Sequence, residues 1–505
     1  MHAIGRRLGL ASGLGAALCI GSWTALGLLG EMQATESLGG EPAMEPQRAA
    51  VGDRLPVGAS ADPQRITAAG IRRLEGKHLT LYTDLEPDPE VDCLPEVFDL
   101  AFEPFCVYFA LDPDKHASWK MTGRLMRDAE RFRRAGLLPE GLPKFANGFT
   151  KSYDFWIYEQ PSTYYRRHLM LHEGVHGLML TLLGSCGPTW YMEGIAELLA
   201  THRWEEGKLV VKYLPRSSEE APMWGRVKIV RDSAQRRGLL SVEELIQMTP
   251  KISGENELYG WCWALAAFLD NHPRYQSQFR QMVAWVRAED FTQRFFRSLG
   301  ENRPLLDEEW KLFVDEICYG YDFGQCAIEF LPGRPIPAEG VEVRVQADRG
   351  WQSSAWRVEA GRTYRLIASG RYQVAQQPRI WWCEPGGVSI QYYRGRPLGM
   401  LLAAVRPEDG SSGGGASAKG LGSSSEERSF SERSGSSGGR RIAEAAPSEQ
   451  AVEPTRTGLL HPIPIGLEAK LRPTASGVLY FRINESPARL SDNAGELVVR
   501  IQPEK

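Results

Sequence analysis

The chain is 505 residues long, and because single hydrophobic cores seldom grow beyond about 250–300 residues, its length predicts more than one domain. Its 59 Lys and Arg residues nearly balance its 63 Asp and Glu residues, so a net charge of −4 argues against nucleic acid as the main partner. Hydrophobic residues at 42% and charged residues at 24% are typical of a chain that folds for the most part.

The N-terminus has the pattern of an export signal. Arg6 and Arg7 precede an uncharged stretch that runs from residue 8 to residue 30. Such a stretch partitions into the bilayer while the arginines stay in the cytoplasm, and it is also long enough to span a membrane. We therefore expect residues 1–30 to be a cleaved signal peptide or an uncleaved anchor, with a buried Gly/Ala-rich helix as the alternative. The protein is then periplasmic, bound to the cell envelope or extracellular, and it contacts the membrane only if the anchor stays attached.

Export would place the cysteines beyond residue 30 in an oxidising compartment. Eight cysteines in the whole chain are too few for a disulfide scaffold, and none of them forms a CxxC pair. The pairs closest in sequence are Cys93 with Cys106 and Cys318 with Cys326. Disulfide pairing and buried free cysteines both remain open.

Residues 31–70 are rich in Gly, Pro, Ala and Glu and lack an apolar period, which predicts a disordered linker. Residues 71–325 then predict an α+β domain with a small mixed sheet and a mainly helical part. Its expected elements are strands at 78–83 and 149–158, a long helix over 162–183, a second helix over 188–202, and helices over most of 225–320.

Residues 326–505 change to period-2 alternation, which predicts an all-β sandwich. The clearest runs are 341–345, 364–367 and 477–483. Residues 406–456 interrupt this domain with a sequence dominated by Gly and Ser. Such a composition buries too little apolar surface to offset its ordering entropy, so we predict a disordered insertion.

A metal-binding pattern lies in the long predicted helix. His172-Glu173-Gly174-Val175-His176 is an H-E-x-x-H motif, and residues i and i+4 share a helix face, so both imidazoles can reach one Zn²⁺. Glu173 lies beside the open coordination position, where it can take a proton from the metal-activated water. Gly174 costs helix stability, which asks for a packing or functional reason.

Two nitrogens do not complete a zinc site. The next predicted helix offers Glu193 and Glu197, again four residues apart, after a turn at 184–188 that sends the chain back. Glu193 can complete a His₂Glu set, and Glu197 can accept the remaining N–H of a ligating histidine and fix its tautomer. The alternative is a solvated acidic helix face.

These residues carry a family resemblance. HEGVH followed by W-x-x-E-G-x-A-E resembles the gluzincin metallopeptidases, the clan of thermolysin and aminopeptidase N, including exported bacterial members. The resemblance covers about residues 71–325. It implies that His172, His176 and Glu193 bind zinc, that Glu173 is the catalytic base, and that Glu197 is the outer carboxylate.

The same resemblance implies two further features. The strand before the active-site helix lies at the sheet edge and pairs with the substrate backbone in this family, and residues 149–158 stand at that place. A downstream tyrosine stabilises the oxyanion in some members, and Tyr259 is the candidate, with core packing as its alternative. The G-x-M-E-N motif that holds a free substrate amine is absent, which favours an endopeptidase.

Two other histidines receive structural interpretations. His168 lies one turn before His172, and we expect a polar residue of the helix face rather than a ligand. His202 closes the second helix, where a cation interacts favourably with the helix dipole, so we predict a C-terminal cap.

The β domain also resembles a known family. Residues 358–370, 480–487 and 491–497 are similar in order and register to the small calcium-dependent galactose-binding lectins of bacteria. By that resemblance Glu485, the carbonyl of Arg489, Asp492 and Asn493 bind one Ca²⁺, which then binds sugar hydroxyls. Glu485 replaces a shorter acid and Asp492 replaces an amide; both stay oxygen donors suited to Ca²⁺, while the identity of the sugar is open. The alternative is a purely structural sandwich.

These features favour an exported zinc peptidase that acts on a protein or peptide and carries a lectin-like β domain. A second hypothesis is a surface glycan-binding protein with a non-catalytic metallo-domain, and a third is a structural cell-envelope protein. A complete zinc-binding pattern with Glu173 intact favours the first, because a degenerate peptidase usually loses this base.

Overall fold

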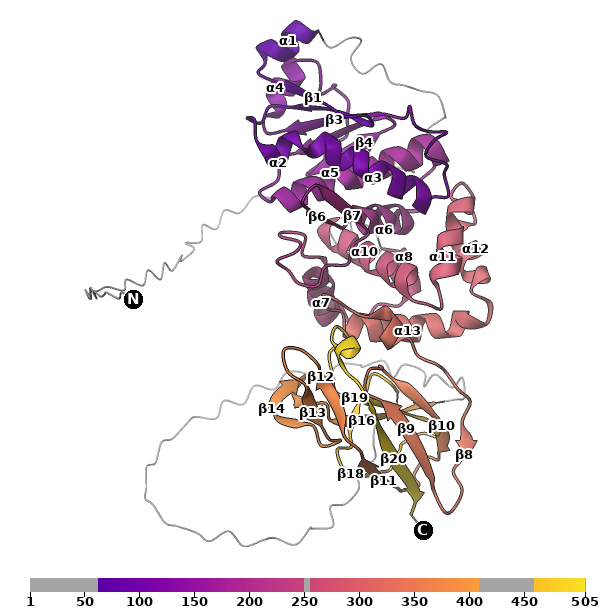
Figure 1. Cartoon of the computed structure of the whole chain (residues 1–505). Helices are drawn as coiled ribbons and strands as arrows, with labels where there is room; N and C mark the ends of the chain where they lie inside the picture. Colours follow the sequence, from indigo (N-terminus) through magenta and orange to yellow (C-terminus); the bar gives the residue numbers. More distant parts are fainter. Residues whose placement is uncertain (1–61, 249–254, 408–457, 505) are drawn as a thin grey trace, which may run out of the picture. The chain divides into compact units, whose positions relative to one another are not determined.

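The computed structural model of the chain describes residues 62–248, 255–407 and 458–504 (Figure 1). The predicted export segment, residues 1–30, lies outside the described residues, as do residues 31–61 and nearly all of the predicted insertion at 406–456. The end of the predicted linker, residues 31–70, is helical and corrects that boundary. Asp62 caps α1 (Pro63–Ala68) by accepting a hydrogen bond from the Gln64 backbone, and Ile66 is buried.

A mixed five-stranded sheet begins the folded part, in the order β1-β2-β3-β5-β4. Its strands are β1 (Arg72–Glu75), β2 (Leu79–Thr83), β3 (Met121–Met126), β4 (Gly148–Lys151) and β5 (Asp154–Tyr158). Strands β2, β3 and β5 are parallel, whereas β1 and β4 pair antiparallel at the two edges. The small mixed sheet expected from the sequence is therefore present.

Alternating side chains give this sheet two covered faces. Phe155 and Ile157 of β5 join the large core together with α3 (Leu94–Tyr108) and α5 (Thr163–Leu178). Trp156 points the other way, into a smaller core with residues of α1 and α4 (Ala129–Arg134). Helix α5 thus lies against a sheet that is buried on both faces.

Gly174 of α5 is required by the close packing of this helix against α3. A Cβ at this position would collide with the ring of Phe98 on α3, so only glycine lets the two helices approach this closely. The cost of a glycine inside a helix is offset by this contact in the core.

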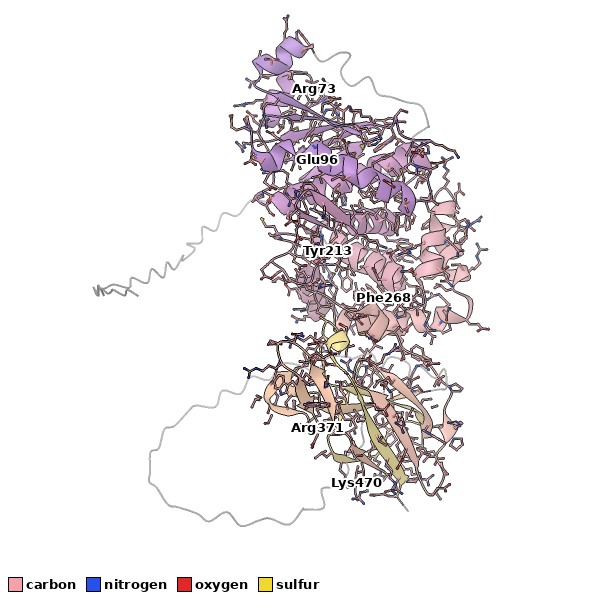
Figure 2. The ribbon with its side chains drawn as sticks, in the orientation of Figure 1. Arg73, Glu96, Tyr213, Phe268, Arg371 and Lys470 are labelled. Carbon is pink, nitrogen blue, oxygen red and sulfur yellow. The ribbon has the colours of Figure 1, made fainter. Side chains whose placement is uncertain are left out.

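Most of the chain from α5 to residue 326 is helical, apart from one hairpin. Its further elements are a π-helical turn at Met179–Leu183, α6 (Thr189–Ala200), β6 (His202–Glu205), β7 (Lys208–Val211), α7 (Arg226–Arg237), α8 (Val242–Ile246), α10 (Glu255–Asn271), α11 (Gln276–Gln281), α12 (Phe291–Ser298), α13 (Arg303–Asp315) and α14 (Phe323–Cys326). The short helix α2 (Pro89–Asp92) precedes α3. Helix α6 packs against both α5 and α10. Figure 2 shows Phe268 of α10, which is 1% exposed in this core, and Arg73 of β1 at the surface.

The C-terminal part consists of strands in two main sheets, ordered β17-β16-β19-β10-β8 and β18-β11-β20-β9. Its strands are β8 (Arg334–Pro335), β9 (Val341–Gln346), β10 (Gln352–Val358), β11 (Tyr364–Ser369), β12 (Tyr372–Ala375), β13 (Trp381–Cys383), β14 (Val388–Tyr393), β15 (Arg396–Leu398), β16 (Leu401–Pro407), β17 (Ile463–Pro464), β18 (Glu468–Leu471), β19 (Gly477–Ile483) and β20 (Glu496–Pro503). One core joins the two sheets, through side chains such as Phe481 of β19 and Leu366 of β11. This is the expected sandwich, and the chain as a whole is α+β.

Membrane-spanning helices and disulfide bonds can also be checked in the residues that the structure describes. No helix among residues 62–248, 255–407 and 458–504 is long and apolar enough to cross a membrane. The cysteines in these ranges are all free, so neither Cys93 with Cys106 nor Cys318 with Cys326 forms a disulfide in this structure.

Candidate metal centre

Helices α5 and α6 bring five ionisable side chains together. His168, His172 and His176 follow one another at four-residue intervals on α5, and Glu193 and Glu197 do the same on α6. Residues at i and i+4 share a helix face, and the two faces meet because the helices pack together. Each of the five residues is at most 9% exposed, so the cluster lies within the protein.

Three potential ligand atoms converge between these helices. The Nε2 atoms of His172 and His176 are 3.0 Å apart. Oε2 of Glu193 lies 3.3 Å from His172 Nε2 and 3.4 Å from His176 Nε2. Ligands bound tetrahedrally to zinc at about 2.0–2.1 Å lie about 3.3 Å from one another. The edges of this triangle therefore match the spacing that a zinc ion requires.

The electrostatics of this triangle also favour a cation. Oε2 of Glu193 is buried and receives no hydrogen bond from the described residues. Burial alone would raise the pKa of Glu193, but the two imidazoles lower it to about 2. Burial alone would lower the histidine pKa values, yet nearby carboxylates, Glu193 in both cases, raise the pKa to about 10 in His172 and about 9 in His176. The site attracts positive charge, which a divalent ion can supply in place of protons.

Glu197 lies beside His172, on the side of its ring that faces away from the triangle. Its Oε1 lies 3.4 Å from Nδ1 of His172, the ring nitrogen that faces away from the triangle. Arg226 donates hydrogen bonds of 2.9 Å to both of its carboxylate oxygens, and His168 Nε2 lies 3.1 Å from its Oε2. Burial alone would raise the pKa of Glu197, but Arg226 and His168 hold it well below its usual range. An ionised Glu197 can therefore fix the orientation of the His172 ring.

His168 is not the surface residue expected from the sequence. It is 1% exposed and lies beside Glu197, and burial lowers its pKa. With His172 and Glu197 it forms a second group of ligand-type atoms within 4.8 Å. Because Arg226 already compensates the charge of Glu197, we interpret this second group as the support of the first.

Glu173, the predicted general base, faces the edge strand of the sheet. Its Oε2 accepts a 2.6 Å hydrogen bond from the Thr150 hydroxyl on β4. Its carboxylate also lies against Gly148, where an added Cβ would collide with Oε1. Burial, opposed by the nearby histidines, raises the pKa of Glu173, and a raised pKa suits a group that accepts a proton near neutral pH.

The segment predicted as one strand over 149–158 is a hairpin. Strands β4 and β5 pair antiparallel around a turn in which Ser152 has a φ of 56°. Asp154, which follows that turn, accepts a 2.5 Å hydrogen bond from the buried guanidinium of Arg124 on β3. The edge strand is therefore Gly148–Lys151 alone, and it is this strand that lies beside Glu173.

Tyr259 lies next to the centre on α10. Its ring centroid is 6.0 Å from that of His172, with the ring planes at 76°. The side chain is half-buried. The structure thus brings the predicted oxyanion-stabilising tyrosine and a predicted ligand together.

His202 is not a helix cap. Helix α6 ends at Ala200, and His202 is the first residue of β6, fully buried and stacked on Tyr164 with ring centroids 4.5 Å apart. Burial lowers the pKa of His202 to about 3. A neutral imidazole cannot act as the cation that the sequence pattern suggested.

The predicted calcium ligands lie in the loop between β19 and β20. Glu485 is 1% exposed and Asn493 is 4% exposed, and each keeps a buried side-chain oxygen, Oε2 and Oδ1, without a hydrogen-bond partner among the described residues. Burial raises the pKa of Glu485 to about 7. Asp492 Oδ1 accepts a 3.0 Å hydrogen bond from the Gln376 backbone, and the Arg489 carbonyl accepts one of 3.1 Å from the Asp492 backbone. Each of these two oxygens is of the type that Ca²⁺ binds.

Comparison with known proteins gives weak similarities only. No protein-family model matches the chain, and no curated protein matches it. Among solved structures, the N-terminal domain of EclA, a PllA-like lectin, is 15% identical, covers 32% of this chain and 95% of its own, and has a TM-score of 0.18. IMPa from Pseudomonas aeruginosa, in complex with an O-glycopeptide, is 10% identical, covers 86% of this chain and 42% of its own, and has a TM-score of 0.12. At TM-scores this low, neither similarity assigns a function.

Proposed function

We propose that the chain is an exported zinc-dependent peptidase, an endopeptidase of the gluzincin type. The observation that carries this proposal is the triangle of His172 Nε2, His176 Nε2 and Glu193 Oε2, with edges of 3.0, 3.3 and 3.4 Å. This is a His₂Glu ligand set, which leaves a fourth tetrahedral position open for chemistry.

The residues around the triangle have the properties that peptide hydrolysis requires. When bound, zinc polarises the scissile carbonyl and makes water a nucleophile at neutral pH. Glu173 accepts the proton of the attacking water and delivers it to the leaving amine, with Thr150 holding its carboxylate at 2.6 Å. Tyr259 donates a hydrogen bond to the oxygen on which negative charge develops.

The edge strand β4 supplies a place for the substrate. It is the last strand of its sheet, so one of its edges has no neighbouring strand among the described residues. An extended peptide can add to such an edge through main-chain hydrogen bonds, and Gly148 keeps the approach to Glu173 free of a side chain. Backbone pairing of this kind needs no free amine, which supports an endopeptidase.

For the β domain we propose Ca²⁺ binding through Glu485, the Arg489 carbonyl, Asp492 and Asn493. The buried oxygens of Glu485 and Asn493 that lack donors support this assignment. A bound Ca²⁺ with open positions can bind sugar hydroxyls. The same observation supports the second candidate function, a surface glycan-binding protein whose metallo-domain is not catalytic.

Two experiments separate these functions. Metal analysis of the purified chain, paired with cleavage of a peptide library, tests the peptidase, and we expect one zinc per chain and cleavage that a chelator abolishes and added Zn²⁺ restores. A zinc-loaded chain that cleaves no peptide, together with Ca²⁺-dependent hits on a glycan array, would favour the second function instead.

A further inference from the structure

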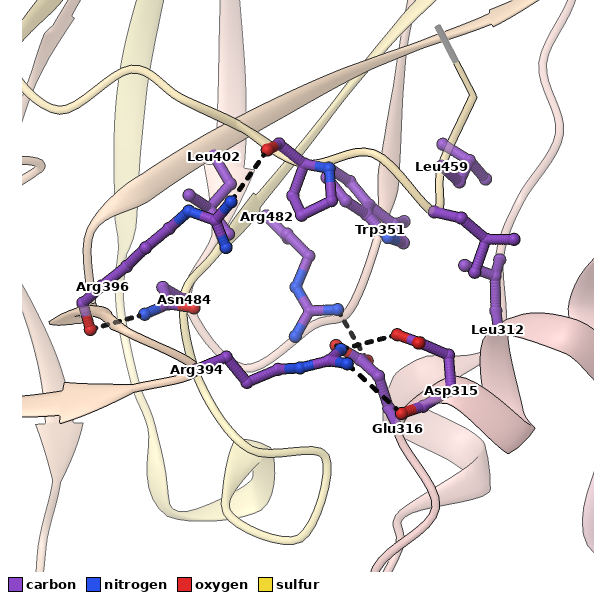
Figure 3. Close-up of a pocket in the computed structure, with 12 residues that line it drawn as sticks. Leu312, Asp315, Glu316, Trp351, Arg394, Arg396, Leu402, Leu459, Arg482 and Asn484 are labelled. Carbon is purple, nitrogen blue, oxygen red and sulfur yellow. Dashed lines mark hydrogen bonds and ion pairs between the residues drawn. The ribbon is translucent and has the colours of Figure 1, made fainter. Parts of the chain in front are cut away.

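A cavity of about 260 Å³ lies apart from the candidate zinc site (Figure 3). It borders the candidate calcium loop, because Arg482 in its wall donates a 2.9 Å hydrogen bond to the Glu485 carbonyl. Its walls come from the C-terminal end of α13, the turn between β14 and β15, the end of β19 and the segment after residue 458. The volume is just below the roughly 300–1,000 Å³ typical of small-molecule pockets. The part of a ligand that enters this cavity is therefore about the size of a monosaccharide or smaller.

One wall is a turn that is held in an unusual conformation. Arg394 and Gly395 have φ values of 49° and 77° between the paired residues Tyr393 and Arg396, the pattern of a type I′ hairpin. Asn or Gly normally fills the first of these positions, and an arginine there is strained. A strained residue persists when the surrounding structure requires its side chain, and the Arg394 side chain extends along the edge of the cavity (Figure 3).

A buried asparagine fixes this turn. Asn484 is 2% exposed, and its Nδ2 donates to the carbonyls of Tyr393, Arg396 and Pro397 at 2.9, 3.0 and 3.0 Å. These contacts fix the backbone from which both turn arginines extend. The cavity wall is thus a rigid, built structure rather than a gap between loose side chains.

The charges around the cavity do not cancel. Arg394 binds Asp315 at 2.6 Å and Glu316 at 3.3 Å, and Arg482, which is 4% exposed, binds Glu316 at 2.8 Å. The guanidinium of Arg396 meets no carboxylate among the described residues. It donates a 3.3 Å hydrogen bond to the Pro462 carbonyl. The lining thus has three guanidinium groups and two carboxylates, which gives it a net charge of +1.

Apart from Asn484, the rest of the lining is apolar. Leu402, Leu459 and Trp351 are each at most 6% exposed and line the cavity beside the arginines. A ligand that fits this lining has a carboxylate at one end for Arg396 and a compact body for the remaining volume. Guanidinium groups suit carboxylates because they can bind both oxygens with two parallel hydrogen bonds.

We propose that this cavity binds a small organic carboxylate of monosaccharide size, such as a hexuronic acid, with Arg396 as the carboxylate-binding residue. The site goes beyond the proposed peptidase and shares none of its residues. The carboxylate belongs either to a free sugar acid or to the terminal residue of a glycan.

Calorimetric titration of the full chain tests this proposal, with glucuronate as the probe and glucose as its neutral counterpart. We expect saturable 1:1 binding of glucuronate, and binding of glucose that is about 10- to 100-fold weaker, because glucose lacks the charge-assisted hydrogen bonds. Arg396→Gln should weaken glucuronate binding to the same extent, and Arg396→Lys should weaken it less. A disaccharide with a terminal glucuronate that binds as well as glucuronate indicates a glycan; binding of the monosaccharide alone indicates a free acid.

The matched control is Arg365→Gln, which removes an exposed arginine of the same sandwich that pairs with Glu468. It should leave glucuronate binding unchanged, and thermal unfolding of Arg396→Gln should match that of the wild type. Equal binding of glucose and glucuronate, no saturable binding of glucuronate, or full binding by a folded Arg396→Gln variant would each overturn the proposal. Peptide cleavage is unaffected in every variant, so failure here leaves the peptidase proposal intact.

Discussion

The Thr150 hydroxyl donates a 2.6 Å hydrogen bond to Oε2 of Glu173, from the edge strand β4 to the helix α5. The same hydroxyl lies 3.0 Å from the backbone carbonyl of Glu173. The carboxylate is therefore held between the strand proposed to bind substrate and the triangle proposed to bind zinc. Its position depends on one threonine and on the missing side chain at Gly148.

Replacing Thr150 by Val keeps the shape of the side chain and removes the hydroxyl. We expect kcat for peptide cleavage to fall about 10- to 100-fold, because a hydrogen bond to a charged group contributes about 1.5–3 kcal/mol. Zinc content should not change, since Thr150 contacts no proposed ligand atom. Thr150→Ser is the matched control and should keep most of the activity. A Val variant with wild-type kcat would show that the hydroxyl does not position the base.

Replacing Arg226 by Met leaves the buried Glu197 without its cation. Breaking one side of a buried ion pair typically costs about 3–5 kcal/mol of unfolding free energy. Because Glu197 then loses its fixed orientation behind His172, we also expect zinc affinity to fall about 10- to 100-fold. Chemical denaturation and competition with a zinc chelator measure the two effects.

Lys228→Met on the same helix is the control for Arg226. It removes an exposed partner of Asp232, and we expect a change of less than about 1 kcal/mol, as for other surface ion pairs. If both variants unfold alike and bind zinc alike, the account of Glu197 as the orienting carboxylate is wrong.

The low pKa of the buried His202 predicts that the folded chain loses stability in acid. Its pKa is about 3 in the folded chain and near 6.5 in the unfolded chain, so between these values only the unfolded chain binds the proton. Stability due to His202 is therefore full above about 6.5 and is lost as the pH falls toward 3. At about 1.4 kcal/mol per unit, the loss reaches about 3 kcal/mol by pH 4.5.

Denaturation of the wild type and of His202→Gln between pH 4.5 and pH 7.5 tests this expectation. The Gln variant is less stable at neutral pH, because it loses the stacking on Tyr164, but its stability should fall less steeply on acidification. Parallel pH profiles for the two proteins would contradict a buried, neutral His202.

Glu485 predicts how calcium stabilises the β domain. Its pKa of about 7 in the calcium-free chain means that Ca²⁺ must displace a proton below that pH. The rise in Tm caused by Ca²⁺ should therefore grow as the pH increases from about 6 to about 8. Glu485→Gln should remove most of this rise. A Ca²⁺ effect that is absent at pH 8, or unchanged in the Gln variant, would exclude Glu485 as a ligand.

The parts of the centre that could be predicted from sequence are those that a helix period alone brings together. His172 with His176, and Glu193 with Glu197, lie four residues apart, so their shared faces follow from the pattern. The strands at 341–345 and 364–367 were likewise predictable, because alternation along a half-buried strand is local. The strand at 477–483 was also predicted, although the structure buries each of its residues.

The supporting residues could not be predicted, because tertiary packing alone brings them to the site. Arg226 reaches Glu197 across 29 residues of sequence, and Thr150 reaches Glu173 across 23. The sequence pattern predicts a polar helix-face residue at His168 and a helix cap at His202, and only the burial of their rings shows otherwise. The left-handed turn at Ser152, which splits 149–158 into a hairpin, carries no glycine to mark it.

The most direct test of the peptidase is a comparison of the wild type with Glu173→Gln for zinc content and peptide cleavage. Glutamine keeps the shape of the side chain and its contact with Thr150, but it cannot accept the proton. We predict one zinc per chain in both proteins, and cleavage in the wild type that falls at least about 100-fold in the variant. Undiminished cleavage by a zinc-loaded Glu173→Gln chain would contradict the mechanism, and a wild-type chain that binds no zinc would contradict the site itself.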